Sequence, residues 1–192
     1  MEARIGKLVY SMMVSLDGFI ETPERSLDWV RIDEELHTFV NDQVRREAAF
    51  LYGRRLYEVM AAYWPTADED PNAPAFEVDF ARIWKRKPKV VFSKTLPSVA
   101  WNSRLVREGA VDEVSRLKQS AEADLEIGGP NLASTMIQHD LVDEFGLFLQ
   151  PVVLGAGTPF FPPLGTRIDL RLLESRTFRS GVTYVRYERS AR

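Results

Sequence analysis

Glycine and basic residues gather at four points where an apolar run gives way to a helical pattern or a loop. The four segments are "LYGRRLY" around Gly53, "FSKTL" around Ser93, "IGGPNLA" around Gly128 and "VLGAGTPFF" around Gly155. A helix N-terminus presents unpaired backbone N–H groups and roughly half a positive charge, which suits a phosphate. Glycine lets the backbone adopt conformations closed to other residues. Together the four points predict a long polyanionic ligand such as a dinucleotide.

Each of these signals is weak when taken alone. Arg54 and Arg55 follow Gly53, but two arginines at a helix start also fit a solvated helix face. The Gly128–Gly129 pair precedes Pro130, which suits the first turn of a helix because its missing N–H has no intrahelical partner there. The same pair also fits an ordinary strand-to-helix turn, so the structural alternative stays open.

The sequence lacks the residues that several other kinds of site require. The pattern G-x-G-x-x-G after the first strand and the P-loop pattern are both absent. With no cysteine, the chain has no disulfide, no thiolate nucleophile and no cysteine zinc site. The only histidines, His37 and His139, leave little material for a metal site, and we expect structural roles for both. No metal site is therefore expected.

The composition describes an ordinary globular protein. The chain has 192 residues, of which 45% are hydrophobic, and a net charge of -3. This charge gives no electrostatic reason to expect nucleic acid or an anionic membrane as a partner. No apolar run approaches the roughly 20 residues of a membrane helix, and none near the start has the length of a signal peptide. We expect a soluble cytoplasmic protein.

Strand and helix patterns alternate along most of the chain. The segments that predict strands are 7–20, which breaks at Asp17–Gly18, then 48–53, then 88–96, where the strand ends near Ser93–Lys94, and then 123–129 and 144–150. Helical spacing appears at 33–48, with Asp33 as N-cap, at 54–64, around 83–84, at 111–117 and at 132–137. Segments 169–178 and 181–189 predict an antiparallel hairpin. The pattern favours one mixed α/β domain over 1–192, with a mainly parallel central sheet flanked by helices and a C-terminal hairpin.

Five segments occur in an order that matches a known family. They are "VSLDGFI", "LYGRRLYEVMAAYWP", "KVVFSKTL", "LEIGGPNLASTMIQHDLVDEFGLFLQPVVLGAGTPFF" and "LLESRTFRSGVTYVRYE". The chain resembles stand-alone proteins of the RibD C-terminal family, the riboflavin-biosynthesis reductases, over nearly its whole length. The resemblance implies a dihydrofolate reductase fold, and NADPH laid across the strand ends.

The resemblance also assigns residues to the cofactor. Those that match the family's cofactor segments are Gly53, Arg54, Arg55, Ser93, Lys94, Gly128, Gly129, Pro130 and Asn131. In the family, Ser93 and Lys94 match the strand end on the side of the adenosine 2'-phosphate. The cations favour NADPH over NADH, since a nearby Arg or Lys stabilises that phosphate when it is bound.

A second group of residues is expected on the substrate side. Asp17 and Gly18 match the turn that borders the nicotinamide, and Leu154, Gly155 and Gly157 match the loop that walls the substrate pocket. Asp17 and Asp28 are the catalytic candidates as proton donors, although the Asp17 carboxylate equally fits a cap of its own turn. Trp29 is a candidate for stacking on a flat heterocycle, as is Trp64, although aromatic residues also fill cores.

One departure from the family concerns the substrate. The riboflavin enzyme usually carries a zinc-dependent deaminase half, for which this chain has neither cysteine nor length. We therefore expect an NADPH-dependent reductase of a small heterocyclic substrate, resembling 5-amino-6-(5-phosphoribosylamino)uracil reductase. The alternatives are a pterin, folate-like or unrelated substrate, and a catalytically silent nucleotide-binding protein. By resemblance alone, we expect a homodimer.

Overall fold

The computed structural model describes residues 5–190. Its helices are α1 (Glu34–Arg46), α2 (Arg54–Tyr63), α3 (Ala75–Arg86), α4 (Ala110–Ser120) and α5 (Pro130–Gln138). Its strands are β1 (Leu8–Ser15), β2 (Phe19–Glu21), β3 (Ala49–Gly53), β4 (Lys89–Phe92), β5 (Ser103–Val106), β6 (Leu125–Gly128), β7 (Glu144–Gln150), β8 (Thr158–Pro159), β9 (Leu170–Thr177) and β10 (Thr183–Arg189). The alternation expected from the sequence is confirmed, as is the Asp33 cap, whose Oδ1 accepts from the Leu36 N–H at 2.8 Å.

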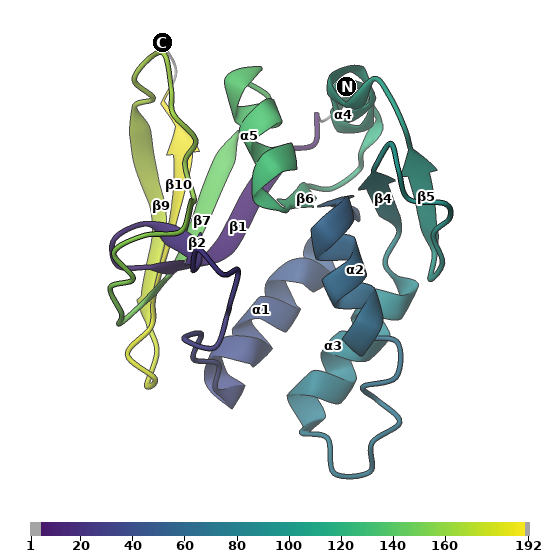
Figure 1. Cartoon of the computed structure of the whole chain (residues 1–192), viewed down its shortest axis with the longest axis vertical. Coiled ribbons are helices and arrows are strands. Elements are labelled where there is room, and N and C mark those ends of the chain that lie inside the picture. Colours follow the sequence, from purple (N-terminus) through teal and green to yellow (C-terminus); the bar gives the residue numbers. More distant parts are fainter. Residues whose placement is uncertain (1–4, 191–192) are drawn as a thin grey trace.

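One sheet of eight strands runs through the molecule (Figure 1), in the order β5-β4-β3-β6-β1-β7-β10-β9. The first six strands in this order pair in parallel, and β10 and β9 add the antiparallel hairpin. The predicted mixed α/β sheet with its C-terminal hairpin is therefore confirmed. Because six neighbouring strands are parallel, all of their carboxyl ends meet at one edge of the sheet.

Helices cover both faces of the sheet. Successive strand residues point to opposite faces, and β3 shows the consequence. Leu51 lies in the apolar cluster that contains Met136 of α5, whereas Phe50 lies in the cluster that contains Val44 of α1 and Trp84 of α3. The sheet thus separates α4 and α5 from α1, α2 and α3 (Figure 1).

The sequence pattern did not predict β5, nor the small sheet formed by β2 and β8. β5 has only four residues, Ser103–Val106, which is too short to show a period. β8 has two residues, Thr158 and Pro159, which follow the loop of Leu154, Gly155 and Gly157. These strands exist because neighbouring segments supply their hydrogen-bond partners. Within 5–190, no helix combines the length and apolar character that a membrane crossing needs.

Candidate functional site

The carboxyl edge of the sheet gathers most of the residues expected to bind the cofactor and substrate. Reading along the edge, β4 ends before Ser93, β3 ends at Gly53, β6 ends at Gly128, β1 ends at Ser15 and β7 ends at Gln150. Neighbouring strands lie about 4.8 Å apart. The segments that begin at these ends therefore form one continuous row, although they are far apart in the sequence. Ligands of open α/β sheets bind at such an edge.

The N-termini of α2 and α5 lie side by side in this row. β3 pairs with β6, with Tyr52 opposite Gly128, so both helices begin from neighbouring strands. Gly129 has a φ of 95°, and a Cβ added there would lie 3.6 Å from the Gly53 nitrogen. Neither N-cap, Gly53 or Gly129, has a side chain to bond the first N–H groups. The first N–H groups of both helices therefore lack a capping side chain, which is the arrangement of a helix N-terminus that binds an anion.

Packing and helix geometry account for the other residues of the segment around Gly128. A Cβ on Gly128 would lie 2.3 Å from Leu56 Cδ2, so glycine lets α2 approach β6. Pro130 occupies the first turn of α5, as the sequence predicts. Asn131 is exposed in the same turn, and its carbonyl accepts from Thr135 Oγ1 at 3.1 Å. The segment thus combines a packing requirement with the open helix N-terminus.

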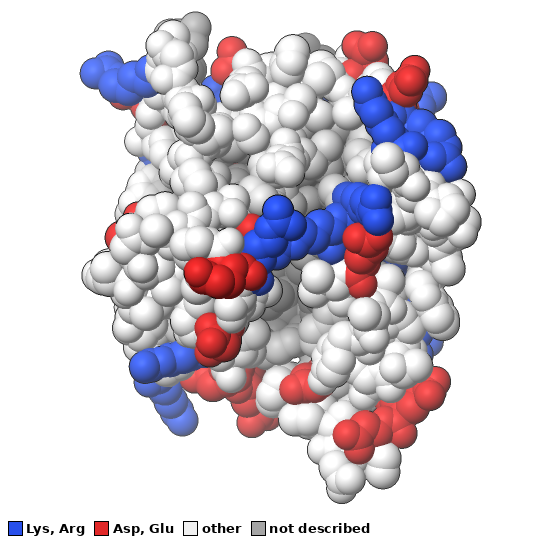
Figure 2. Space-filling view, viewed as in Figure 1, with Lys and Arg blue, Asp and Glu red and all other residues white. Residues whose placement is uncertain are grey.

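Basic side chains lie beside these helix starts. Arg54 Nε donates to Glu58 at 2.9 Å, and its Nη1 donates to Thr95 Oγ1 at 2.7 Å. Ser93 Oγ accepts from the N–H groups of Thr95 and Leu96, at 3.3 and 3.0 Å, which shapes the turn that carries Lys94. Figure 2 shows basic side chains in a band across the middle of this face, next to a hollow in the surface.

Arg55 takes part in a different interaction. Its Nη2 lies 2.6 Å from Glu21 Oε2, and Thr158 Oγ1 donates to Glu21 Oε1 at 2.7 Å. Burial alone would raise the pKa of the Glu21 carboxyl, but the hydrogen bonds from Arg55 and Thr158 outweigh it and lower the pKa below its ordinary value. The guanidinium of Arg55 thus joins α2 to β2 and β8 through Glu21. The role expected for Arg55 beside the cofactor phosphates stays a prediction.

Asp17 fastens the turn after β1 to the loop after β7. Its carboxylate accepts from Ser15 Oγ at 2.7 Å and from the N–H groups of Leu154 and Gly155, at 3.1 and 2.7 Å. The Ser15 bond and the two backbone bonds lower the pKa of Asp17 to about 2. The carboxyl is thus ionised near neutral pH and has no proton to give. This geometry favours the capping role over the role of proton donor.

Glycines are required in the loop expected to wall the substrate pocket. Gly155 and Gly157 have φ values of 77° and 151°, which other residues rarely adopt. A Cβ on Gly157 would lie only 2.0 Å from the Glu21 carbonyl oxygen, so the loop packs directly on β2. Gly18, in the facing turn, has a φ of 92°. The loop after β7 and the turn after β1 therefore lie against each other at the carboxyl edge of the sheet.

Asp28 and Trp29 lie in the segment between β2 and α1. Asp28 is exposed and its N–H donates to Ser26 Oγ at 3.2 Å, while Trp29 is half-buried with Nε1 donating to the Ser26 carbonyl. The buried Gln150 holds this segment: its side-chain amide accepts from the Arg31 N–H at 3.0 Å and donates to the Arg31 carbonyl at 3.3 Å. The roles of Asp28 and Trp29 in catalysis stay predictions.

Three other residues have structural surroundings. Trp64 packs on Phe80, with ring centroids 4.3 Å apart, which favours the core role that was the alternative to stacking on a heterocycle. His37 is buried, with Nδ1 3.1 Å from Asn41 Oδ1, and burial lowers its pKa. His139 is the C-cap of α5, where the sequence predicts a helix end.

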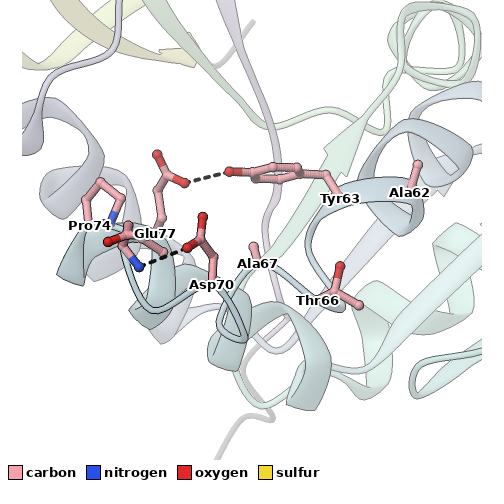
Figure 3. A pocket seen from close by; sticks show the side chains of 9 residues that line it. Ala62, Tyr63, Thr66, Ala67, Asp70, Pro74 and Glu77 are labelled. Atoms are coloured by element: carbon pink, nitrogen blue, oxygen red, sulfur yellow. Dashed lines mark hydrogen bonds between the residues drawn. The ribbon is translucent and has the colours of Figure 1, made fainter.

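A cavity of about 250 Å³ lies between the end of α2 and the start of α3 (Figure 3). It is lined in part by Tyr63, Asp70 and Glu77, and Tyr63 Oη donates to Glu77 Oε2 at 2.6 Å. α2 has 10 residues, so the cavity lies about 15 Å from the glycines at its N-terminus. Its carboxylates would repel a phosphate. We therefore place the candidate site at the carboxyl edge and not in this cavity.

Sequence reasoning missed three residues of the edge. Arg107 follows β5, the strand that was not predicted. Glu21 and Gln150 are polar residues in apolar surroundings, which their sequence context does not distinguish from solvent-facing strand positions. The alternation of polar and apolar residues around Glu21 and Gln150 does not indicate that their side chains bind other buried groups. Within the part of the chain that is described, no group of three or more His, Cys, Asp or Glu residues could hold a metal ion.

The chain is similar to known proteins both in sequence and in structure. Residues 6–184 match the model of the RibD C-terminal domain. The uncharacterised protein YyaP of Bacillus subtilis (strain 168) is 34% identical over 182 residues, covering 94% of each chain. The structure of a putative riboflavin biosynthesis protein from Shewanella sp. PV-4 superposes with a TM-score of 0.74 at 23% identity, covering 97% of this chain and 99% of that one.

A dihydrofolate reductase has the same architecture. The enzyme from Enterococcus faecalis, in complex with NADP(H) and RAB-propyl, superposes with a TM-score of 0.66 at 14% identity, covering 97% of this chain and 98% of that one. At such identities the two structural likenesses show the fold alone. The chain has the dihydrofolate reductase-like fold expected from the sequence.

Proposed function

The chain belongs to the RibD C-terminal domain family, and on that premise we propose that it is an NADPH-dependent reductase of a small heterocyclic substrate. The observation that carries the proposal is the pair of helix N-termini at Gly53 and Gly129, with Arg54 and Lys94 at the neighbouring strand ends. Helix N-termini suit the diphosphate of a dinucleotide, and the cations suit its additional phosphate. The NADP(H) bound by the dihydrofolate reductase from E. faecalis, which shares the fold, supports the same choice of cofactor.

In this proposal the cofactor supplies the hydride, and the protein binds, orients and excludes water. The backbone N–H groups at the starts of α2 and α5 hold the diphosphate. Asp17 holds the loop of Leu154 and Gly155 against the turn after β1, which encloses the substrate side. Asp28 stays the side-chain candidate for delivering a proton, with a water molecule as the alternative.

The chemistry of the substrate follows from the family and not from the fold. We propose a flat heterocycle of the kind reduced in riboflavin biosynthesis, since residues 6–184 match the RibD C-terminal domain. A pterin, a folate-like compound or an unrelated substrate is the alternative for an enzyme. A nucleotide-binding protein without catalysis is the alternative from another class.

Calorimetric titration of the purified protein with NADPH and, separately, NADH tests the cofactor. We expect NADPH to bind at micromolar concentration and NADH much more weakly. Arg54→Ala removes charge-assisted hydrogen bonds of about 1.5–3 kcal/mol, so NADPH should bind roughly 10- to 100-fold more weakly. Arg167→Ala is the control, because this exposed arginine pairs with Asp169 in the loop before β9, away from the carboxyl edge of the sheet.

Two results would contradict the proposal. If well-folded protein binds neither nucleotide, the reductase assignment is wrong and the glycines are plain structural turns. If NADPH binds but no pterin, folate-like compound or aminouracil oxidises it, as followed by absorbance of the reduced nicotinamide, the silent nucleotide-binding protein is favoured instead.

We also propose a homodimer that uses the C-terminal hairpin. β9 is an edge strand of the sheet, and its Leu172 and Leu173 are 49% and 39% exposed. An exposed edge strand with apolar side chains is a ready partner for another strand. Light scattering should give the mass of two chains, and Leu172→Glu should shift that mass toward one. A monomer at all concentrations would exclude this assembly.

A further inference from the structure

The cavity between the end of α2 and the start of α3 has no part in the proposed function (Figure 3). Its volume is about 250 Å³, below the roughly 300–1,000 Å³ of sites for drug-sized ligands. Ala62, Ala67, Ala73 and Pro74 supply an apolar part of its wall. Among the described residues that line it, none is Lys, Arg or His. The cavity therefore suits a small ligand with a short apolar part.

Two carboxylates border the cavity without a cation partner. Glu77 Oε2 accepts from Tyr63 Oη at 2.6 Å, and Asp70 Oδ1 accepts from the Asn72 N–H at 2.9 Å. The second oxygen of each carboxylate accepts no hydrogen bond from residues 5–190, and neither group forms an ion pair within that range. Figure 3 shows Tyr63 and both carboxylates around the same space. Each carboxylate thus has an oxygen to offer to a ligand.

The neighbouring carboxylates do have cation partners. Asp68, in the same loop, lies 2.7 Å from Lys85 Nζ, and Asp79 of α3 lies 2.7 Å from Arg45 Nη2. The acids on either side of the cavity are therefore neutralised, whereas those that line it are not. A hollow lined by one sign of charge concentrates ions of the opposite sign. This cavity should therefore attract a cation.

The end of α2 adds to the negative potential. The last turns of α1, α3 and α4 carry Lys or Arg, but that of α2 has no basic residue. A helix C-terminus carries roughly half a negative charge, because its last carbonyl groups have no intrahelical partner. Tyr63 is the last residue of α2, so this end borders the cavity. The start of α3 has the opposite polarity, but Glu77 in its first turn offsets it.

We propose that this cavity binds a guanidinium group on a short alkyl stem. A guanidinium is planar and weakly hydrated, pairs with carboxylates and stacks on aromatic rings. The Tyr63 ring, 52% exposed, offers the aromatic surface, and Asp70 and Glu77 offer the carboxylates. The alanine and proline side chains contact the stem. An ammonium group fits less well, because it is a compact and strongly hydrated charge.

The test is an NMR titration of the intact protein with n-propylguanidinium, followed through the backbone amides of residues 62–77. A ligand with so few atoms should bind with a Kd on the order of 1 mM. Propylurea has nearly the same shape without the charge, and it should bind roughly tenfold more weakly. Neither probe involves the nucleotide site, so the result does not depend on the proposed function.

Four variants locate the binding energy. Asp70→Asn and Glu77→Gln keep the size of the side chain, and each should weaken binding about threefold to fivefold. Tyr63→Leu should weaken it by about threefold, whereas Tyr63→Phe keeps the ring and should bind as the unmodified protein does. Glu69→Gln is the matched control, because this exposed residue of the same loop does not line the cavity. Thermal unfolding of each variant reports whether it is folded.

A capped Gly-Arg-Gly peptide distinguishes two sources of the same group. Binding as tight as that of n-propylguanidinium supports the site as a receptor for the arginine side chain of a partner protein. Exclusion of the peptide, with n-propylguanidinium still bound, supports a free guanidine compound as the ligand.

Four results would overturn the proposal. The first is equal binding of n-propylguanidinium and propylurea, because the charge would then have no effect. The second is equal weakening by Glu69→Gln and Glu77→Gln, which would reduce the site to a general attraction by the acidic loop. The third is tighter binding of Ca²⁺ than of n-propylguanidinium at the same amides, which would assign the carboxylates to a metal ion. The fourth is no shift of these amides at concentrations well above the expected Kd.

Discussion

At the amino edge of the sheet, the Glu144 carboxylate lies buried between two cations. Its side chain is 2% exposed, and its oxygens lie 2.5 Å from Lys7 Nζ and 2.5 Å from Arg186 Nε. At the opposite, carboxyl edge, Lys94 and Arg107 have no carboxylate partner among the described residues. At these positions the sheet therefore compensates a buried charge internally at the amino edge, and leaves two cations without a carboxylate partner at the carboxyl edge.

Lys89, at the start of β4, is another buried charge of the amino edge that has its partners within the protein. This residue is only 1% exposed, yet its Nζ donates to the carbonyl oxygens of Trp84 and Lys87, at 2.5 and 2.8 Å. It thereby satisfies carbonyl groups at the end of α3, as a cation near a helix C-terminus does. The difference between the edges teaches which charges serve the fold: those with internal partners stabilise it, and those without are the candidates for ligand binding.

The largest effect should come from removing the compensating charge at the amino edge. Glu144→Ala leaves the half-buried Arg186 without its partner, which should lower the free energy of unfolding by about 3 kcal/mol. Urea denaturation measures this change. The Kd for NADPH should stay the same, because the residue lies at the other end of the strands. Weaker NADPH binding at unchanged stability would break the comparison between the edges. Glu188→Ala, at a more exposed ion pair, should cost under about 1 kcal/mol.

A smaller effect on stability, with a larger one on binding, is expected at the carboxyl edge. In Gly129→Ala the new residue must adopt a φ near 95°, which costs about 1–2 kcal/mol. Its Cβ would also enter the space beside the Gly53 nitrogen, so NADPH should bind at least about tenfold more weakly. Gly181→Ala is the matched control, since its φ is 86° in the turn of the C-terminal hairpin. Equal loss of binding in both variants would mean that strain, and not the site, is responsible.

The smallest effect concerns the pH dependence of stability at the amino edge. Glu47 Oε2 is inaccessible to solvent and accepts no hydrogen bond from any residue of 5–190. Burial and the neighbouring carboxyl raise the pKa of Glu47, and burial raises that of Glu126, against the opposing charge of Lys87. A proton shared by two carboxyl groups satisfies such an acceptor. Arg186 and Tyr52 are the other titratable groups that face this pair.

The sign of this dependence follows from the direction of the pKa shift. A raised pKa contributes stability below the unfolded value of 4.5 and loses it as the pH rises through the folded value. Stability should therefore fall as the pH rises above 4.5, and Glu126→Gln should flatten this fall. Thermal unfolding between pH 5 and 9 measures it, with the exposed Glu122→Gln as control. Parallel curves for the protein and Glu126→Gln would contradict the shared proton.

Local patterns in the sequence were sufficient for most of the fold. Asp33 begins α1 because its side chain bonds a backbone N–H three residues later, and such a contact is written in adjacent residues. The alternation of strands and helices likewise follows from the spacing of apolar residues. The dihedral freedom needed at Gly129 and Gly155 is also a local property, because it depends on the absence of a Cβ at that residue alone.

Partners that come from distant parts of the chain were decided by the tertiary structure. Arg55 and Arg54 are adjacent and look equivalent in the sequence, but the first reaches Glu21 and the second reaches Thr95. Asp17 is a proton-donor candidate by type, yet N–H groups 137 and 138 positions away bind its carboxylate. Arg107 lies beside Lys94 only because β5 pairs with β4. Residue type and local spacing determine which groups carry charge, whereas the order of strands in the sheet determines which of these charges find a partner.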